Sequence, residues 1–380
     1  MHQFEFPMPP VEPAEAALRR EVRAFLAEKL AGRTPRERAQ SWNGHDAAFS
    51  REVGQRGWIG MSWPKRYGGH ERSALERYVV IEEMLAAGAP VAAHWTADRQ
   101  SGPLLFKFGT EEQRQTFLPR IARGECFFCI GMSEPDSGSD LAAARTRAVP
   151  VDGGFRVTGT KLWTTYGHRA HYMILFCRTS EGKRHEGTSQ LLVDLASPGI
   201  KISPVIEMSG AHHFNEVSFE DVFVPADRLI GREGEGWAQV MSELAFERSG
   251  PERFLSTLPL LVALVREVGA EWSPEAERAI GRLFAHLVVL RHLSHSVAGM
   301  LEAKQDPALQ AALVKDLGAV FEQEIPEVAR LLVAAEPSIS ARSEYAAALA
   351  VSMLAAPSFS LRGGTREILR GIIARGLGLR

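Results

Sequence analysis

Two stretches decide the fold class of this chain: Gly131-Met132-Ser133-Glu134-Pro135-Asp136-Ser137-Gly138-Ser139-Asp140 and, further on, Gly159-Thr160-Lys161-Leu162-Trp163-Thr164-Thr165. The first is a turn rich in hydroxyls and backbone N–H groups, and the second places a single Trp beside Thr residues. Hydroxyls and amides can bind the edge of a planar, polar heterocycle while an indole covers its face. The alternative is a polar β-turn and a strand Trp in an ordinary β-domain, and finding both segments in this order argues against it.

The two stretches resemble the flavin-binding segments of acyl-CoA dehydrogenases, where a hydroxyl-Glu-Pro…Gly-Ser-Asp segment precedes Lys-x-Trp-x-Thr. The resemblance extends over nearly the whole chain and includes Phe214-Asn215-Glu216-Val217. It implies FAD as cofactor and an acyl-CoA thioester as substrate. The positions that it assigns to cofactor contacts are Met132, Ser133, Ser139, Trp163, Thr165, Thr365 and Glu367. Ser139 is also a candidate contact for the CoA substrate.

The apolar spacing changes twice along the chain. It is helical from about Glu12 to Gly124, with a stripe of Leu18, Val22, Phe25, Leu26 and Leu30. Short β-rich runs separated by turn residues follow, from Glu125 to about Gly231. From Glu235 the pattern is helical again. We therefore expect an N-terminal helical domain (1–124), a middle antiparallel β-domain (125–231) and a C-terminal helical domain (232–380), the α+β organisation of acyl-CoA dehydrogenases.

Three local features refine this expectation. Thr110 and Gln113 have the spacing of a capping box at a helix start. Pro326 is expected to break or kink its helix, and Thr365 to cap the last one. A second apolar stripe is expected at Ile280, Leu283, Phe284, Leu287 and Leu290.

Composition narrows the class of protein. The 380 residues are 45% apolar and 24% charged with a net charge of −2, which suggests neither a nucleic-acid nor a membrane partner. The first residues lack a basic segment followed by an apolar run, so we expect a cytoplasmic protein. Cys126 and Cys129 lie three apart in an expected buried strand, which favours core cysteines over a redox or metal pair. His212-His213 favours a turn or interface, and no metal site is predicted.

The catalytic base is the least usual feature that the resemblance points to. In many family members it is a Glu directly before Gly-Thr in the C-terminal zone, and this chain has Gly363 there, followed by Gly364-Thr365. In other members of the family the catalytic Glu lies on the first long helix after the β-domain, directly before an Arg. Glu247-Arg248 matches that arrangement. Glu247 is therefore the candidate base, Glu243 is the alternative, and Arg248 is a candidate substrate contact or structural partner. The Gly363–Gly364 amides remain candidate donors to the thioester oxygen.

Half of the family's shared cofactor site is not recognisable. The segments that hold the adenine and pyrophosphate of a neighbouring subunit's FAD are Arg-x-x-Phe-Gly and Gln-x-x-Gly-Gly-x-Gly. This chain has Arg282-Leu283-Phe284-Ala285-His286 and Ala350-Val351-Ser352-Met353-Leu354-Ala355-Ala356 at those places. We therefore expect a hetero-oligomer with a related subunit, and a homo-oligomer in which Arg282 reaches the phosphates by another route is the alternative.

The resulting hypothesis is an FAD-dependent acyl-CoA dehydrogenase that passes electrons to an electron-transfer flavoprotein. Bases on the earlier helix occur with branched or bulky acyl chains, including steroid side chains, so a bulky substrate is favoured. The alternatives are a non-catalytic structural subunit of a heteromeric enzyme and a flavin-dependent acyl-CoA oxidase.

Overall fold

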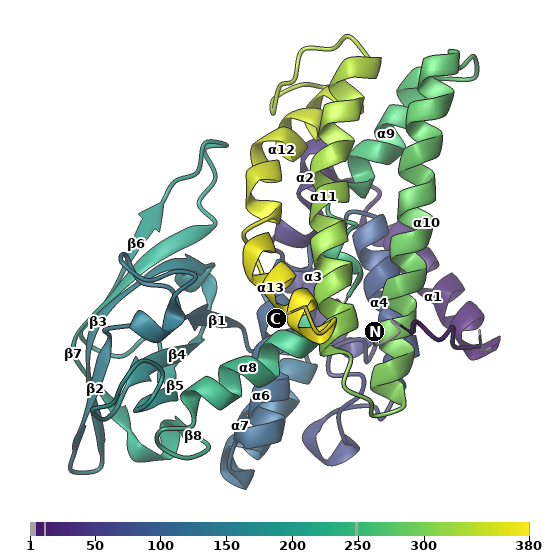
Figure 1. The fold of residues 1–380 in the computed structure, drawn as a ribbon. Coiled ribbons are helices and arrows are strands. Elements are labelled where there is room, and N and C mark those ends of the chain that lie inside the picture. The colour runs from purple at the N-terminus through teal and green to yellow at the C-terminus, as the bar shows by residue number, and fades with distance from the viewer. Residues whose placement is uncertain (1–4, 11–12, 248–249, 380) are drawn as a thin grey trace. The chain divides into compact units, whose positions relative to one another are not determined.

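A computed structural model describes residues 5–10, 13–247 and 250–379 of the chain (Figure 1). The chain divides into two compact units. The first comprises residues 1–45, 72–91 and 245–380, and the second comprises 46–71 and 92–244. The predicted order of helices, strands and helices is confirmed. The predicted domain boundaries at 124/125 and 231/232 stay predictions.

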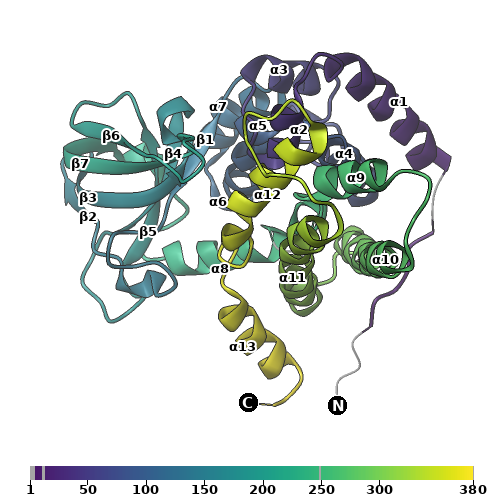
Figure 2. The same cartoon turned by 90° about the horizontal axis from the view of Figure 1, so that it is seen from above.

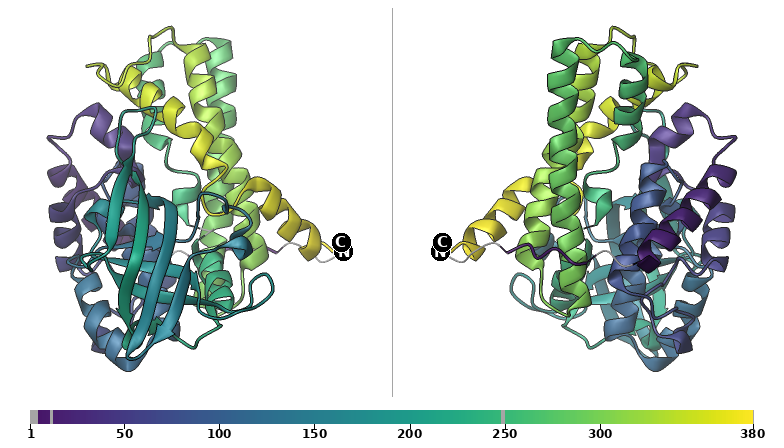
Figure 3. Two further views of the ribbon diagram at one scale, coloured as in Figure 1. Left: turned by 90° about the vertical axis from the view of Figure 1, so that its left-hand side faces the viewer. Right: turned by 90° about the vertical axis from the view of Figure 1, so that its right-hand side faces the viewer.

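The second unit is built on a sheet, whose broad face is turned to the viewer in the left view of Figure 3. Among the described residues its strands run in the order β6-β7-β3-β2-β4-β5-β8, and β1 pairs with β4. The bounds are β1 Phe128–Gly131, β2 Arg147–Val151, β3 Gly154–Thr165, β4 Tyr172–Arg178, β5 Thr188–Asp194, β6 Ile200–Val205, β7 Phe214–Pro225 and β8 Leu229–Ile230. Most pairs are antiparallel, as predicted, but β1 and β2 each pair with β4 in parallel.

Alternation along the strands makes the core of this unit. One cluster joins Cys129, Leu175, Val193, Val217 and further buried side chains from the facing strands. Cys126, Cys129 and Cys177 are free and buried, and burial raises the pKa of the Cys126 thiol to about 11. The interpretation of the cysteines as core residues is confirmed, although β1 starts at Phe128 rather than at residue 125.

Short helices complete the second unit. They are α3 Ala47–Gln55, α5 Ala92–Thr96, α6 Gly102–Phe108 and α7 Glu111–Ala122, with the start of α8 (Gly236–Glu247) after the sheet. The predicted capping box is present, because the Thr110 side chain accepts from the Gln113 N–H while the Gln113 side chain accepts from the Thr110 N–H. Gln113 also donates to the carbonyls of Asp227 and Leu229, which ties α7 to the end of the sheet.

The first unit is helical (Figure 2). Its helices are α1 Pro13–Lys29, α2 Pro35–Gln40, α4 Ala74–Ala86, α9 Leu258–Val268, α10 Pro274–Glu302, α11 Ala308–Leu332, α12 Glu344–Phe359 and α13 Arg366–Gly376. The predicted stripe on α1 is buried. On α4, the buried carboxylates of Glu82 and Glu83 are paired with Arg19, Arg23 and Arg291, as buried charges require.

Two predictions for the long helices need correction. Pro326 does not break its helix, because α11 continues through it to Leu332. A kink at Pro326, the other predicted outcome, stays a prediction. Phe284 does not belong to the buried stripe: Ile280, Leu283 and Leu290 on α10 are buried, whereas Phe284 is 44% exposed. Phe284 follows Leu283 directly and so points about 100° away around the helix axis.

Candidate functional site

The site begins at the turn after β1, where Glu134 is buried. Its carboxylate accepts hydrogen bonds from the backbone N–H groups of Arg145 (2.6 Å) and Thr146 (2.9 Å). Glu134 and Ser137 exchange two backbone hydrogen bonds, at 2.8 and 3.1 Å. A buried carboxylate is stable only with such donors. Ser133 is therefore followed directly by a buried carboxylate, Glu134, whose hydrogen bonds hold the turn in place.

Lys161, on β3, completes this anchor. Its side chain is fully buried, and its Nζ donates to Glu134 Oε1 (2.8 Å) and to the Met132 carbonyl (2.9 Å). Burial lowers the pKa of Lys161, and the carboxylate opposes that shift. Burial also disfavours the charge on Glu134, yet Lys161 holds the pKa of Glu134 below its ordinary value. The Leu162 N–H donates to the Ser133 carbonyl (2.9 Å), so the two stretches form one structure.

Trp163 stands on a bulge of β3. The register with β7 shifts between Lys161 and Thr164, and Trp163 has φ +61°. Trp163 as a residue is 55% exposed, and the centroids of its ring and the Phe214 ring lie 5.7 Å apart in an edge-to-face contact. An aromatic side chain exposed to this extent is not a core residue, and its ring is free to cover a flat ligand. This is the surface that the sequence predicts for the face of a planar heterocycle.

The neighbouring polar residues lie beside this indole in the chain. Trp163 is exposed, Thr164 is buried and Thr165 is half-buried. Met132 and Ser133 are half-buried, and Ser139 is exposed farther along the turn. A backbone hydrogen bond from Leu162 to Ser133 thus joins the turn of Met132 and Ser133 to the strand that carries Trp163 and Thr165.

In the first unit, the loop before α13 has glycines at both positions of its turn. Gly363 has φ +70° and Gly364 φ +96°, a region that favours glycine. A Cβ built on Gly363 would lie 2.9 Å from Nη2 and 3.1 Å from Cζ of Arg253. Arg253 is buried, so it has little room to withdraw. A side chain at residue 363 is therefore opposed both by the backbone and by a packed guanidinium.

The residue before this turn lies in a buried polar network that the sequence did not predict. Arg362 donates from Nη2 to Glu322 Oε2 (2.7 Å), to Ser256 Oγ (2.7 Å) and to the Glu252 carbonyl (3.1 Å). Its guanidinium carbon lies 4.4 Å from the ring centroid of Trp42. Burial lowers the pKa of Arg362, and the charge of Glu322 opposes that shift. The network fixes the chain directly before Gly363.

Thr365 occupies the N-cap position of α13, as predicted, but its side chain makes no capping hydrogen bond. Glu367 follows in the first turn of α13 and is exposed. A hydrogen bond from its own backbone amide, and then the Thr365 hydroxyl, lower the pKa of Glu367. Both polar groups thus lie at the surface of the first unit, and their assignment to the cofactor stays a prediction.

The candidate base falls on α8. Glu243 lies within this helix and Glu247 is its last residue, while their side chains are outside the described part of the structure. Arg248 lies outside the described residues. The assignment of Glu247, the alternative Glu243 and the role of Arg248 therefore stay predictions.

The segments expected to hold adenine and pyrophosphate have another structure here. Arg282 forms an ion pair with Glu324 on α11, and His286 Nδ1 lies 3.4 Å from the same carboxylate. Residues 350–356 lie within helix α12, where no Gly-rich turn can form. The two segments that match the family's adenine-side motifs poorly thus also differ in structure. Residues 350–356 are helical, and Arg282 is already paired with the carboxylate of Glu324.

The imidazoles of the β-domain do not form a metal centre. His212 stacks on His168 with ring centroids 3.8 Å apart, and His213 Nδ1 lies 2.8 Å from Glu207 Oε1. Within residues 5–10, 13–247 and 250–379, no group of three or more His, Cys, Asp or Glu side chains could hold a metal ion. In the same part of the chain, no helix is long and apolar enough to cross a membrane.

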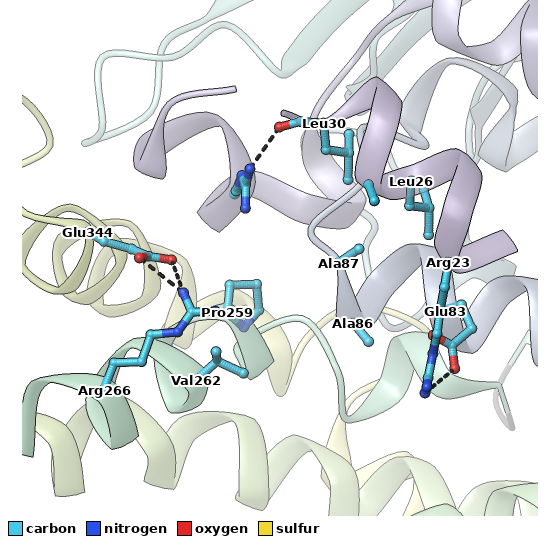
Figure 4. Close-up of a pocket in the computed structure, with 12 residues that line it drawn as sticks. Arg23, Leu26, Leu30, Glu83, Ala86, Ala87, Pro259, Val262, Arg266 and Glu344 are labelled. Atoms are coloured by element: carbon cyan, nitrogen blue, oxygen red, sulfur yellow. Dashed lines mark hydrogen bonds and ion pairs between the residues drawn. The ribbon is translucent and has the colours of Figure 1, made fainter. Parts of the chain in front are cut away.

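A separate cavity of about 360 Å³ lies in the first unit among α1, α2, α4, α9 and α12 (Figure 4). Its charged walls are largely paired with each other, Arg23 with Glu83 and Arg266 with Glu344. None of the predicted site residues lines it. The cavity is therefore not part of the candidate site.

Comparisons with known proteins bear on the whole chain. Residues 12–125 match the acyl-CoA dehydrogenase N-terminal domain and residues 129–222 match the acyl-CoA dehydrogenase middle domain. Acyl-CoA dehydrogenase IpdE1 of Mycobacterium tuberculosis (strain ATCC 25618 / H37Rv) is 32% identical, over 95% of this chain and 97% of that protein.

Solved structures agree with this result. A chain of the "Tcur3481-Tcur3483 steroid ACAD" superposes with a TM-score of 0.88 at 28% identity, covering 98% of this chain and 99% of that one. A chain of the ChsE4-ChsE5 complex from Mycobacterium tuberculosis gives a TM-score of 0.85 at 30% identity, covering 98% and 99%. With the two domain matches and a relative that is similar along almost its full length, the chain belongs to the acyl-CoA dehydrogenase family, whose members are FAD-dependent oxidoreductases that act on acyl-CoA.

Proposed function

We propose that this enzyme introduces a double bond between Cα and Cβ of an acyl-CoA thioester, with Glu247 as the base. The observation that carries the proposal is the packing of Arg253 against Gly363, at the position where many family members have their base. That loop offers no carboxylate, and a side chain at residue 363 would need a left-handed backbone and a shift of the Arg253 guanidinium, so we look for the base on another element. Helix α8 ends with Glu247, directly before Arg248, in the second arrangement used in the family.

The chemistry requires a base and an oxyanion donor together. The α-proton of a thioester is weakly acidic, so the developing enolate oxygen needs preorganised donors. The Cα–H bond breaks towards the Glu247 carboxylate, the hydrogen on Cβ leaves with its electron pair, and a C=C bond forms. Bound FAD supplies the hydride acceptor. We assign the backbone N–H groups of the Gly363–Gly364 turn to the thioester oxygen.

The flavin contacts that we propose in the second unit come from Met132, Ser133, Trp163 and Thr165. Their support is the exposed indole of Trp163 on an anchored bulge, with half-buried polar groups close to it in the fold. An indole face and hydroxyl edges fit a flat ring with polar margins. We further propose that Thr365 and Glu367, which belong to the first unit, contact the cofactor outside its ring.

The base assignment is tested with Glu247→Gln and the matched variant Glu243→Gln, one helical turn earlier. Each is purified with its flavin content measured and then mixed with acyl-CoA without oxygen. We expect Glu247→Gln to retain FAD and to lose flavin bleaching, while Glu243→Gln bleaches normally. The reverse pattern would move the base to Glu243, and normal bleaching in both would remove the base from α8.

The assembly that we propose is a hetero-oligomer with a related subunit that carries the adenine-side segments. Arg282 is already paired with Glu324, and that carboxylate would repel an approaching pyrophosphate. Charge-assisted hydrogen bonds to the phosphates, worth about 1.5–3 kcal/mol each, must then come from another chain. The two solved structures compared above are each named as a pair of chains, which agrees with such an assembly.

Production of this chain alone, followed by mass measurement and flavin quantification, tests the assembly. We expect substoichiometric FAD, restored by co-production with the related subunit. A homodimer or homotetramer with one tightly bound FAD per chain and full activity would refute it. A colourless protein even after co-production would instead favour the second candidate, a non-catalytic structural subunit, which the missing adenine-side segments also motivate.

A bulky acyl chain, such as a steroid side chain, is the proposed substrate. It is supported by the absence of a base at Gly363 and by the relative named a steroid ACAD. A panel of acyl-CoA thioesters scored by anaerobic flavin reduction tests this, and a preference for straight medium chains would refute it. We further propose that an electron-transfer flavoprotein accepts the electrons in the cytoplasm. Rapid reoxidation by oxygen would instead indicate the alternative, an acyl-CoA oxidase.

Contacts to CoA are assigned to Ser139 and Arg248. Ser139 is exposed on a turn between Gly138 and Asp140, and hydroxyls with backbone amides suit phosphate. Ser139→Ala is expected to raise the KM for CoA esters more than it lowers kcat. An unchanged KM would exclude a substrate contact at this residue.

A further inference from the structure

Asn215, on β7, has contacts that neither the flavin segments nor the chemistry explain. The residue is fully buried and lies opposite Thr164 of β3 in the strand register. Its Nδ2 donates to the Thr164 carbonyl at 2.9 Å. Its Oδ1 lies 3.1 Å from His168 Nδ1 and 2.7 Å from His212 Nε2. One amide thus joins two imidazoles to the strand that carries Trp163.

The chemistry of these groups fixes their orientation. A backbone carbonyl can only accept, so the NH2 group of Asn215 must face Thr164 and its oxygen must face the imidazoles. Each imidazole then has to donate, which places a proton on His168 Nδ1 and another on His212 Nε2. The result is a directed chain of hydrogen bonds that ends on the Thr164 carbonyl.

The two imidazoles also support each other. Their rings stack with centroids 3.8 Å apart and an interplanar angle of 15°. Burial is the main cause that lowers the pKa of His168, and the charge of the neighbouring His212 is the next. Arg169 and His213 also lower this pKa. His213 in turn is bonded to Glu207. Neutral rings at this distance can pack face to face, whereas two imidazolium ions would repel.

The carbonyl held by this chain lies at a sensitive place. The β3–β7 register is interrupted between Lys161 and Thr164, and Trp163 in that gap has a left-handed backbone. Such a conformation persists only where the surrounding structure determines it. Lys161 and its ion pair hold the start of the bulge. Asn215 holds the end of the bulge through the carbonyl of Thr164, the residue between Trp163 and Thr165.

We propose that Asn215, oriented by His168 and His212, is a positioning residue that sets Trp163 and Thr165 for binding the flavin. This inference rests on the proposed placement of FAD against those two residues. It assigns to the imidazole pair a role in cofactor affinity, exerted through the Asn215 amide and not through contact with substrate.

The test uses the full-length chain in its native assembly and measures the FAD Kd by titrating apoprotein with FAD. Asn215→Asp keeps the shape but removes the donor to Thr164, and His212→Leu removes one donor to Asn215. His185→Leu, an exposed imidazole of the same unit that packs against Trp237, is the matched control. We expect the FAD Kd to rise roughly tenfold in Asn215→Asp and roughly threefold in His212→Leu, with no change in the control.

A double variant separates a positioning effect from general damage. Adding His212→Leu to Asn215→Leu, a background that contains no buried carboxylate, should raise the Kd no further than Asn215→Leu alone, because both changes interrupt one chain of bonds. Unchanged FAD affinity in Asn215→Asp would overturn the proposal. If that variant does not fold, an unchanged affinity in His212→Leu overturns it equally. Weaker binding in Trp163→Leu and Thr165→Ala with normal binding in the Asn215 and His212 variants would refute only the positioning role. Normal binding in Trp163→Leu and Thr165→Ala would refute the flavin placement itself.

Discussion

Replacing Lys161 with Met tests whether the buried ion pair is what holds together the two segments that we propose to bind the flavin. Met keeps most of the apolar stem of Lys161 but removes the cation. The substitution leaves Glu134 without one of its partners and the Met132 carbonyl without its Lys161 donor. Glu134 retains the N–H groups of Arg145 and Thr146.

The magnitude follows from what remains. Removing one partner of a buried ion pair costs about 3–5 kcal/mol, because the other charge stays buried. Two backbone donors still face Glu134, so we place the loss of unfolding free energy near the lower limit, at about 3 kcal/mol. In Lys161→Met/Glu134→Gln the stranded charge is absent, and the loss should be smaller than in Lys161→Met alone.

The assay is urea unfolding followed by circular dichroism, together with the FAD content of the folded protein. We expect a lower urea midpoint and reduced flavin in Lys161→Met, with partial recovery of both in the double variant. A loss below about 1 kcal/mol, the range of an exposed pair, would refute the anchoring role. A double variant that is less stable than Lys161→Met would refute the stranded-charge argument.

Three further outcomes are expected. The stabilisation from Glu134, measured against Glu134→Gln, should be complete above about pH 4.5 and disappear as the pH falls through the lowered pKa of Glu134 in the folded state. A difference in stability that stays constant over that range would contradict a lowered pKa. Glu247→Gln/Gly363→Glu should remain inactive in anaerobic flavin bleaching and unfold earlier than Glu247→Gln, because Arg253 and the positive φ oppose a side chain at residue 363; recovered bleaching would show that the loop can accept a base. Thr110→Ala should cost about 1 kcal/mol in urea unfolding through loss of the cap, with Thr110→Ser as the conservative control.

The sequence predicts the elements of this fold well wherever a local pattern determines them. The α1 stripe, the capping box at Thr110 and the β-rich runs are all present, because each depends on residues close together in the chain. The errors arise where other parts of the chain decide. Pro326 stays within a helix that packs along its length, and the parallel pairing of β1 with β4 depends on a partner more than forty residues away.

The same distinction applies to the candidate site. Ser133 and Trp163 could be selected from their motifs, but the reason for their placement could not. Lys161 and Glu134 are separated in sequence, and only the fold shows that they form a pair. The only sequence signal for Lys161 is its place in the Lys-x-Trp-x-Thr segment, because β3 also carries the exposed Arg156. No comparable signal marks Arg362, whose partners come from four different elements of the first unit.

The position of Gly363 gives a physical reason for a base on another helix. A Glu at residue 363 would need a left-handed backbone, which is unfavourable for a residue with a side chain. Its Cβ would also approach the buried Arg253 guanidinium. A side chain at residue 363 would require the Arg253 guanidinium to move, whereas a Glu at the end of α8 requires no change in the loop. The loop can then keep its backbone amides as donors, fixed by the Arg362 network, while the acid–base group resides elsewhere. On this view the separation of base and oxyanion donor is a consequence of how the first unit packs.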